Sequence, residues 1–126
     1  MTLTAELLEG RGQPYRVFVL VKDGRCETAD FIGSLAKLDR ARIFALVKRC
    51  AASPQGPLGI RNDEKVKRLG DDIWELKAGL VRILFFLDGP GRMILTNGFK
   101  KKQRKTPRGE IERAQRLRSM YLEQRS

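Results

Sequence analysis

Three closely spaced strand candidates in the second half of the chain constrain the fold more than any other feature of the sequence. Ile73–Lys77 alternates apolar and polar residues, Leu80–Leu87 is apolar except for Arg82, and Met93–Thr96 is a third, shorter candidate. The turns between them contain glycine and are too short to cross over a sheet, so consecutive strands must be antiparallel neighbours. The sequence therefore predicts an antiparallel meander.

The first half of the chain predicts one clear strand and two helices. Tyr15–Val21 is rich in β-branched and aromatic residues and reads as a strand. Thr28 and Asp39 are candidate N-caps, each followed by apolar residues at helical spacing, which predicts an αα-hairpin. Residues 1–12 show no clean period and are expected to form a loose arm or a short strand.

The middle and the end of the chain add a connector, a short strand and a last helix. The connector is Ser53–Glu64, with several Pro and Gly residues, and the short strand is Val66–Leu69. Thr106 and Pro107 fit the N-cap and first helical position of the last helix. Its predicted apolar stripe is Ile111, Ala114, Leu117 and Tyr121. We therefore expect a single α+β domain over residues 1–126, with helices packed on an antiparallel sheet and one sheet face left open for a partner.

Positive charge gathers after the last predicted strand, which is expected to stop at Gly98-Phe99. Six of the nine residues that follow Phe99 are cationic: Lys100, Lys101, Lys102, Arg104, Lys105 and Arg108. Residues 92–126 hold 11 Lys and Arg against 3 Asp and Glu, so they carry +8 of the net charge of +11. Two interpretations are open, a solvated loop or a surface for a phosphate-bearing partner, and the asymmetry favours the second.

Several classes of protein and site are disfavoured by what the sequence lacks. No apolar run is long enough to span a membrane, and the N-terminus does not resemble a signal peptide, so a cytoplasmic protein is expected. Histidine is absent, and Cys26 and Cys50 are too few for a disulfide framework or a zinc site. We expect both cysteines to be reduced and structural, and we expect no metal or other cofactor.

Arg82 is the one charge within an apolar strand, and a lone buried charge is costly unless it is paired. It has two interpretations: an edge residue paired with Glu75 across the hairpin, or a cation that faces a polar groove. Because side chains two apart point the same way, Glu75 and Lys77 share one face of their strand. If Arg82 joins them, Lys77, Arg82 and Lys100–Lys102 converge on a surface that would bind a phosphodiester backbone.

Such a surface could also cleave RNA without a metal ion. Cleavage needs a base for the 2′-OH proton, cations for the phosphorane and an acid for the leaving 5′-oxygen. A lysine crowded by other cations has a lowered pKa and can serve as the base, whereas arginine suits the charged transition state. Trp74 is either a core residue, as a Trp in an alternating strand usually is, or a platform for base stacking, and Phe99 is more open to stacking.

Two segments, DDIWELKAGLVRILFFLDG and ILTNGFKKKQRKTPRGEIERAQRLR, together resemble the RelE/ParE toxin superfamily, and most closely its phage-derived HigB-like branch. The resemblance covers roughly residues 15–124 and implies a RelE-like fold with an N-terminal αα-hairpin, an antiparallel sheet and a C-terminal helix. It implies the toxin of a type II toxin–antitoxin pair, an mRNA interferase that cuts mRNA on the ribosome. It also implies a cognate antitoxin, expected to be a helix-turn-helix DNA-binding protein.

The resemblance assigns roles to individual residues. Lys77 matches a strand lysine proposed as the base in RelE-like enzymes, Arg82 matches the arginine that stabilises the transition state, and Lys100 or Lys101 matches a further cation. HigB-like chains often have His where this chain has Asn97, and no residue is assigned as the general acid. The residues expected to contact RNA are Trp74, Asn97, Phe99, Lys102, Arg104 and Lys105.

Two other functions fit the same residues. In the first, which the superfamily itself offers, a ParE-like chain uses this fold without catalysis to inhibit a replication protein such as gyrase. In the second, the chain is a basic nucleic-acid-binding module without cleavage, whose affinity would fall steeply with salt.

Overall fold

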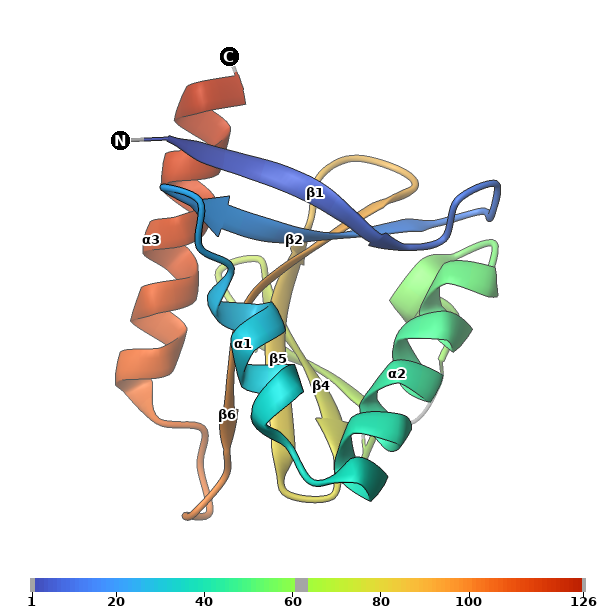
Figure 1. The fold of residues 1–126 in the computed structure, drawn as a ribbon, viewed down its shortest axis with the longest axis vertical. Helices are drawn as coiled ribbons and strands as arrows, with labels where there is room; N and C mark the ends of the chain where they lie inside the picture. The colour runs from blue at the N-terminus through green and yellow to red at the C-terminus, as the bar shows by residue number, and fades with distance from the viewer. Residues whose placement is uncertain (1, 61–63, 126) are drawn as a thin grey trace.

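A computed structural model describes residues 2–60 and 64–125, and across these residues the chain forms one six-stranded sheet with helices on both faces. The strands, in the spatial order β1-β2-β6-β5-β4-β3, are β1 (Leu3–Glu9), β2 (Arg16–Lys22), β6 (Arg92–Lys100), β5 (Val81–Leu87), β4 (Ile73–Ala78) and β3 (Val66–Gly70). The helices are α1 (Glu27–Ser34), α2 (Lys37–Ala52) and α3 (Arg108–Arg125), with a short 3₁₀ turn, η1 (Gly56–Gly59). The sheet is strongly twisted: in Figure 1 β1 and β2 lie across the top, whereas β4, β5 and β6 are steeply inclined.

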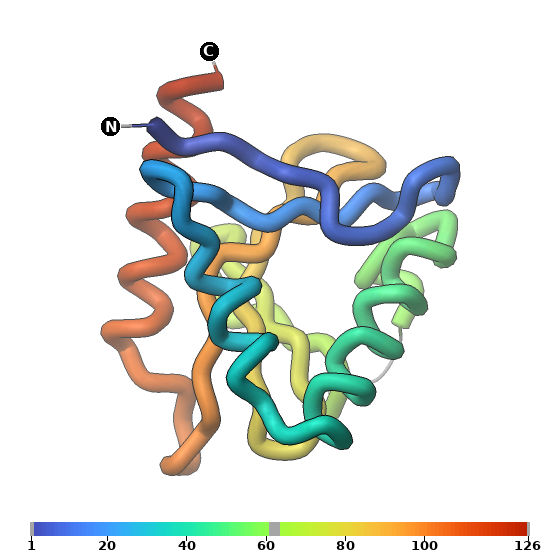
Figure 2. The backbone as a smooth tube through the Cα atoms, in the orientation of Figure 1, coloured from blue at the N-terminus to red at the C-terminus, as the bar shows by residue number. Residues whose placement is uncertain are grey.

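The sheet separates two hydrophobic layers. On one face α1 and α2 bury residues such as Ile32, Ile43 and Val47 against the sheet. On the other face α3 buries Ala114 and Tyr121. The backbone tube in Figure 2 shows α3 and α2 on opposite sides of the strands. Because both faces are covered, each strand of the meander has buried residues on both sides, and β5 is buried along nearly its whole length.

The α+β class and the antiparallel meander are confirmed. β4 pairs with β5 and β5 with β6, both antiparallel, and the predicted short strand is β3. Two expectations are wrong. The sheet is not purely antiparallel, because β2 runs parallel to β6. After β2 the αα-hairpin leads to β3 at the far edge of the sheet, and the meander then returns to place β6 beside β2. The face expected to stay open is covered by α3.

The N-terminal segment was predicted to be either a loose arm or a short strand, and it forms the strand β1. It pairs antiparallel with β2 and lies at the edge of the sheet. Only Leu3 in this strand is fully buried, while Leu7 is more than a third exposed. An edge strand with so little buried surface does not need strict alternation, which is why the sequence pattern is weak there.

Both N-caps predicted for the αα-hairpin are wrong. The thiol of Cys26 caps α1, and Thr28 lies inside the helix with its hydroxyl donating to the carbonyl of Thr96 at 3.0 Å. Thr96 is the extra residue of a β-bulge in β6, and its carbonyl accepts this hydrogen bond from α1. Helix α2 begins at Lys37, so Asp39 lies within its first turn, where a carboxylate favours the helix dipole.

The boundaries around the cationic segment also differ from the prediction. Strand β6 continues through Lys100, because this residue still pairs with Val81 of β5. The hydroxyl of Thr106 does not cap the last helix; it donates to the carboxylate of Glu75 at 2.8 Å, and α3 begins at Arg108. Pro107 precedes the helix rather than opening it.

The predicted connector contains the turn η1, and its residues 61–63 lie outside the described part of the chain. In the parts that are described, no helix combines the length and the apolar character needed to cross a membrane.

Candidate functional site

A row of three side chains crosses the sheet at the end where β4 turns into β5. Lys77 of β4 lies directly opposite Arg82 of β5, and Arg82 lies opposite Phe99 of β6. Directly opposed residues place their Cβ atoms about 4.5–5.5 Å apart on the same face. The predicted convergence of Lys77 and Arg82 is therefore present, on the face that also carries α3.

Arg82 is a buried cation held by its surroundings. Its side chain is 9% exposed, and one guanidinium nitrogen, Nη1, donates to the carbonyls of Gly79 and Val81. The other near partner is Glu75, whose Oε1 lies 3.4 Å from Nε, within ion-pair range but without hydrogen-bond geometry. The pairing with Glu75 is thus present, but β5 is a central strand and not an edge.

Beside this row lies a second one, Glu75, Leu84 and Asn97, which the start of α3 covers. The carboxylate of Glu75 is 1% exposed and accepts the Thr106 hydroxyl. The side-chain amide of Asn97 donates to the backbone carbonyl and the carboxylate of Glu110, at 3.2 and 3.0 Å. Asn97 is therefore engaged inside the protein, between β6 and α3, rather than facing solvent.

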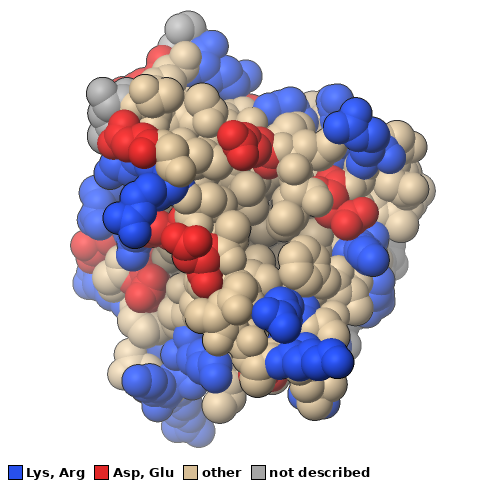
Figure 3. Space-filling view, viewed as in Figure 1, with Lys and Arg blue, Asp and Glu red and all other residues tan. Residues whose placement is uncertain are grey.

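The cationic segment leaves the sheet beside the β4–β5 turn. The backbone N–H of Lys101 donates to the carbonyl of Leu80 at 2.7 Å, which fixes the start of the loop there. Lys102, Arg104 and Lys105 are exposed, and within the described residues none of these three side chains forms an ion pair. In Figure 3 positive side chains gather along the lower edge of the molecule, where this loop lies.

Two of the predicted residues lie on the opposite side of the sheet from the row. Trp74 is half-buried and packs against the α1–α2 core, with its ring stacked on Phe85 at 6.3 Å between centroids. Lys100 pairs with Val81, which places its side chain on the same side as Trp74. Phe99 lies in the row but is half-buried in the α3 core. The register therefore joins Lys77, Arg82 and Phe99 and separates them from Trp74 and Lys100.

Both cysteines are unpaired, as expected. Cys50 is fully buried, and burial raises the pKa of its thiol to about 12, so the thiol stays protonated at neutral pH. Among the described residues no group of three or more His, Cys, Asp or Glu side chains is arranged to hold a metal ion.

One comparison with known proteins identifies the family. The family model described as "Phage derived protein Gp49-like (DUF891)" matches residues 30–119, which run from α1 through most of α3. The chain belongs to the Gp49-like family. This family is phage-derived, and membership in it is consistent with a toxin-like protein. No curated protein matches the chain.

The Gp49-like chain also has features that the sequence did not single out as functional. The sequence indicates Glu75 only as a possible partner of Arg82, whereas in the structure it also anchors the cationic loop through Thr106. The sequence signal that pointed to Glu75 was its position two residues before Lys77, on the same strand face. A second group of cations, on α2 and at the start of β3, gave no signal because its members are far apart in sequence.

Proposed function

We propose that this Gp49-like protein is the toxin of a type II toxin–antitoxin pair, an endoribonuclease that cuts mRNA on the ribosome and is neutralised by an antitoxin. The observation that supports the proposal is the row formed by Lys77 and Arg82 beside the exposed loop cations. An amine and a guanidinium on one face, next to a cationic loop, form a combination suited to phosphodiester chemistry.

In the proposed reaction the ribose 2′-oxygen attacks the adjacent phosphorus and the bond to the 5′-oxygen breaks. Lys77, in its neutral form, takes the 2′-OH proton, and one lysine of Lys100–Lys102 gives a proton to the leaving 5′-oxygen. Arg82 and the remaining cations stabilise the negative charge that builds on the phosphorane. The products are a 2′,3′-cyclic phosphate and a free 5′-hydroxyl.

Arg82 is held away from solvent, so the proposal requires that RNA reach it. The hydrogen bonds of Nη1 lie on the turn side, while Nε faces Glu75 and has no hydrogen bond. A phosphate that enters beside Lys77 would compete with the Glu75 carboxylate for the guanidinium. Thr106 donates a hydrogen bond to the Glu75 carboxylate. If the phosphate displaced that carboxylate, this hydrogen bond would break and the cationic loop would open at the same time.

The test is primer extension on a defined mRNA with and without translating ribosomes, using the wild type, Lys77→Ala and Arg82→Ala. We expect cuts only with ribosomes, and a loss of about 10²-fold or more in each variant. Lys48→Ala, an exposed lysine of α2 outside the row, is the matched control and should cut like the wild type. Thermal unfolding of each variant establishes that it is folded. Cutting that survives Arg82→Ala in a folded protein would contradict the assignment of Arg82.

A second candidate is a non-catalytic inhibitor of a replication protein such as gyrase. The observation that favours it is the burial of Arg82, whose guanidinium is engaged by two backbone carbonyls and a nearby carboxylate. This candidate predicts no mRNA cuts under any condition and inhibition of gyrase supercoiling that Lys77→Ala leaves unchanged.

A further inference from the structure

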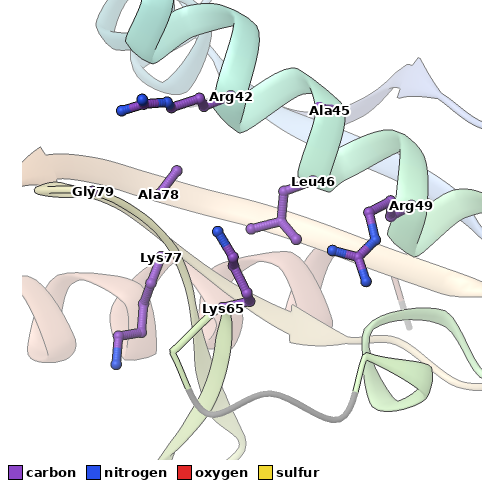
Figure 4. A pocket seen from close by; sticks show the side chains of 8 residues that line it. All are labelled: Arg42, Ala45, Leu46, Arg49, Lys65, Lys77, Ala78 and Gly79. Carbon is purple, nitrogen blue, oxygen red and sulfur yellow. The ribbon is translucent and has the colours of Figure 1, made fainter.

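A second group of cations lines a groove between α2 and the end of β4, and this groove shares only Lys77 with the row that contains Arg82. The groove has a volume of about 390 Å³ and is lined by Arg42, Ala45, Leu46, Arg49, Lys65, Lys77, Ala78 and Gly79. Among the described residues, its lining contains cations but no carboxylate. In Figure 4 Arg42 and Arg49 extend from α2 and Lys65 reaches up toward the helix, whereas Lys77 points away. The groove therefore presents mainly Arg42, Arg49 and Lys65.

These three cations form no ion pair within the described part of the chain. Arg42 and Arg49 are seven residues apart on one face of α2, which corresponds to about 10.5 Å along the helix. Across the described residues, Arg42, Arg49 and Lys65 form no ion pair, whereas Arg92, Arg113 and other arginines do. Like charges gathered without ion-pair partners favour an anionic ligand.

Two exposed leucines flank the same groove. Leu38 lies one turn before Arg42 on the same face of α2 and is 60% exposed, and Leu80, next to Gly79, is 65% exposed. They are the two most exposed large apolar side chains among the described residues. An RNA backbone would neutralise the cations and leave both leucines in water. A polypeptide with acidic and apolar side chains would complement both features.

We propose that this groove docks an acidic, amphipathic segment of a partner protein, with carboxylates on Arg42, Arg49 and Lys65 and apolar side chains on Leu38 and Leu80. Identifying that partner as the antitoxin rests on the proposed function; the docking itself does not. The groove opens on the α2 side of the sheet, whereas Arg82 faces α3, so a partner seated here does not contact Arg82, although Lys77 borders both sites.

The test is fluorescence anisotropy with three labelled probes: a helical peptide of glutamate and leucine, a polyglutamate peptide of equal length and a short oligouridylate. Arg42→Glu should weaken binding of the glutamate–leucine peptide about tenfold or more. Lys48→Glu reverses an equal charge on the same helix outside the groove and is the matched control, expected to change the affinity by roughly twofold at most. Leu80→Ser should weaken binding of the glutamate–leucine peptide but not of polyglutamate.

Three outcomes would overturn the proposal. Equal losses in Arg42→Glu and Lys48→Glu would mean attraction by net charge alone. An unchanged peptide affinity with reduced oligouridylate binding in Arg42→Glu would assign the groove to nucleic acid. Equal effects of Leu80→Ser on both peptides would show that apolar contacts with Leu80 do not contribute to binding. Circular dichroism shows whether each variant is folded, and because no probe is cleaved in the measurement, an absence of mRNA cutting would contradict the proposed function and leave this result standing.

Discussion

Glu75 and Arg82 form a buried pair of opposite charges in the middle of the sheet. Each is at least nine-tenths buried, and their closest atoms, Oε1 and Nε, are 3.4 Å apart. Removing two charges from water is costly, and the attraction between them offsets much of that cost only while both are present. The additional hydrogen bonds from Thr106 to Glu75, and from Arg82 to backbone carbonyls, complete the compensation.

Loss of one member of this pair should therefore destabilise the protein strongly. We expect Glu75→Gln to lower the free energy of unfolding by about 3 kcal/mol, because the Arg82 guanidinium is left without a counter-charge. The double variant Glu75→Gln/Arg82→Met should be more stable than the single one. Urea unfolding at neutral pH measures both. Glu112→Gln, in the exposed pair with Arg108, should change little, and an equally small effect of Glu75→Gln would show that the pair is not energetically coupled.

At the scale of elements, α1 packs onto β6 at a glycine. A Cβ built on Gly98 would meet the ring of Phe31 in α1 and would lie 2.7 Å from Cδ1 of Ile83 in β5. The absence of a side chain at Gly98 thus allows the helix to approach the strand closely. Gly98 is the neighbour of Phe99 in β6. The packing of α1 on Gly98 therefore helps to position the end of the row that contains Arg82.

Gly98→Ala should separate α1 from β6 and destabilise the protein by about 1–3 kcal/mol, because the Phe31 ring cannot move aside without losing its own packing. Gly109→Ala is the matched control: it lies in the first turn of α3, and apart from its chain neighbours and the backbone of its own helix nothing lies within 4 Å of its Cβ position. Alanine there should raise stability by up to about 1 kcal/mol. Thermal unfolding compares the two, and equal stabilities would contradict the close approach.

At the scale of the whole molecule, α3 is fastened to the sheet at both ends. Its start is held by the hydrogen bonds between Asn97 and Glu110. Near its end, the Tyr121 hydroxyl donates to the buried carboxylate of Asp88 at 2.7 Å and accepts from Arg92 at 3.0 Å. Burial, and then the hydrogen bond to Asp88, raise the pKa of Tyr121 above its usual range.

This shift predicts how stability changes in alkali. The folded state holds the phenol proton more tightly than the unfolded chain does, so the contribution of Tyr121 is fully present below the unfolded pKa of about 10 and is lost as pH rises through the folded pKa. Tyr121→Phe should cost about 1–2 kcal/mol at neutral pH and should lose less stability than the wild type above pH of about 10.

Urea unfolding from neutral to alkaline pH measures the difference between the two proteins. Cys50, whose pKa is raised to about 12, lowers the stability of both proteins as pH rises, so it cancels in the comparison. Parallel pH curves for the two proteins would contradict the assignment to Tyr121.

Much of the fold, but less of the site, could be predicted from the sequence. The order of elements followed from local patterns: the turns of the meander admit only antiparallel neighbours, and the stripe that contains Ala114 and Tyr121 identifies the buried face of α3. The pairing of Lys77 with Arg82 was also within reach, because a tight hairpin fixes its own register.

The tertiary structure alone decided the remaining features, since each depends on which surface meets which. The parallel contact of β2 with β6 pairs residues 76 positions apart in sequence, and no local pattern encodes it. The hydroxyls of Thr28 and Thr106 act on Thr96 and Glu75 rather than as helix caps, because buried polar groups brought close by packing compete for the same hydrogen bonds. The sequence by itself therefore determined the elements and the hairpin that carries Lys77 and Arg82, and the tertiary structure decided that Arg82 is buried beside Glu75.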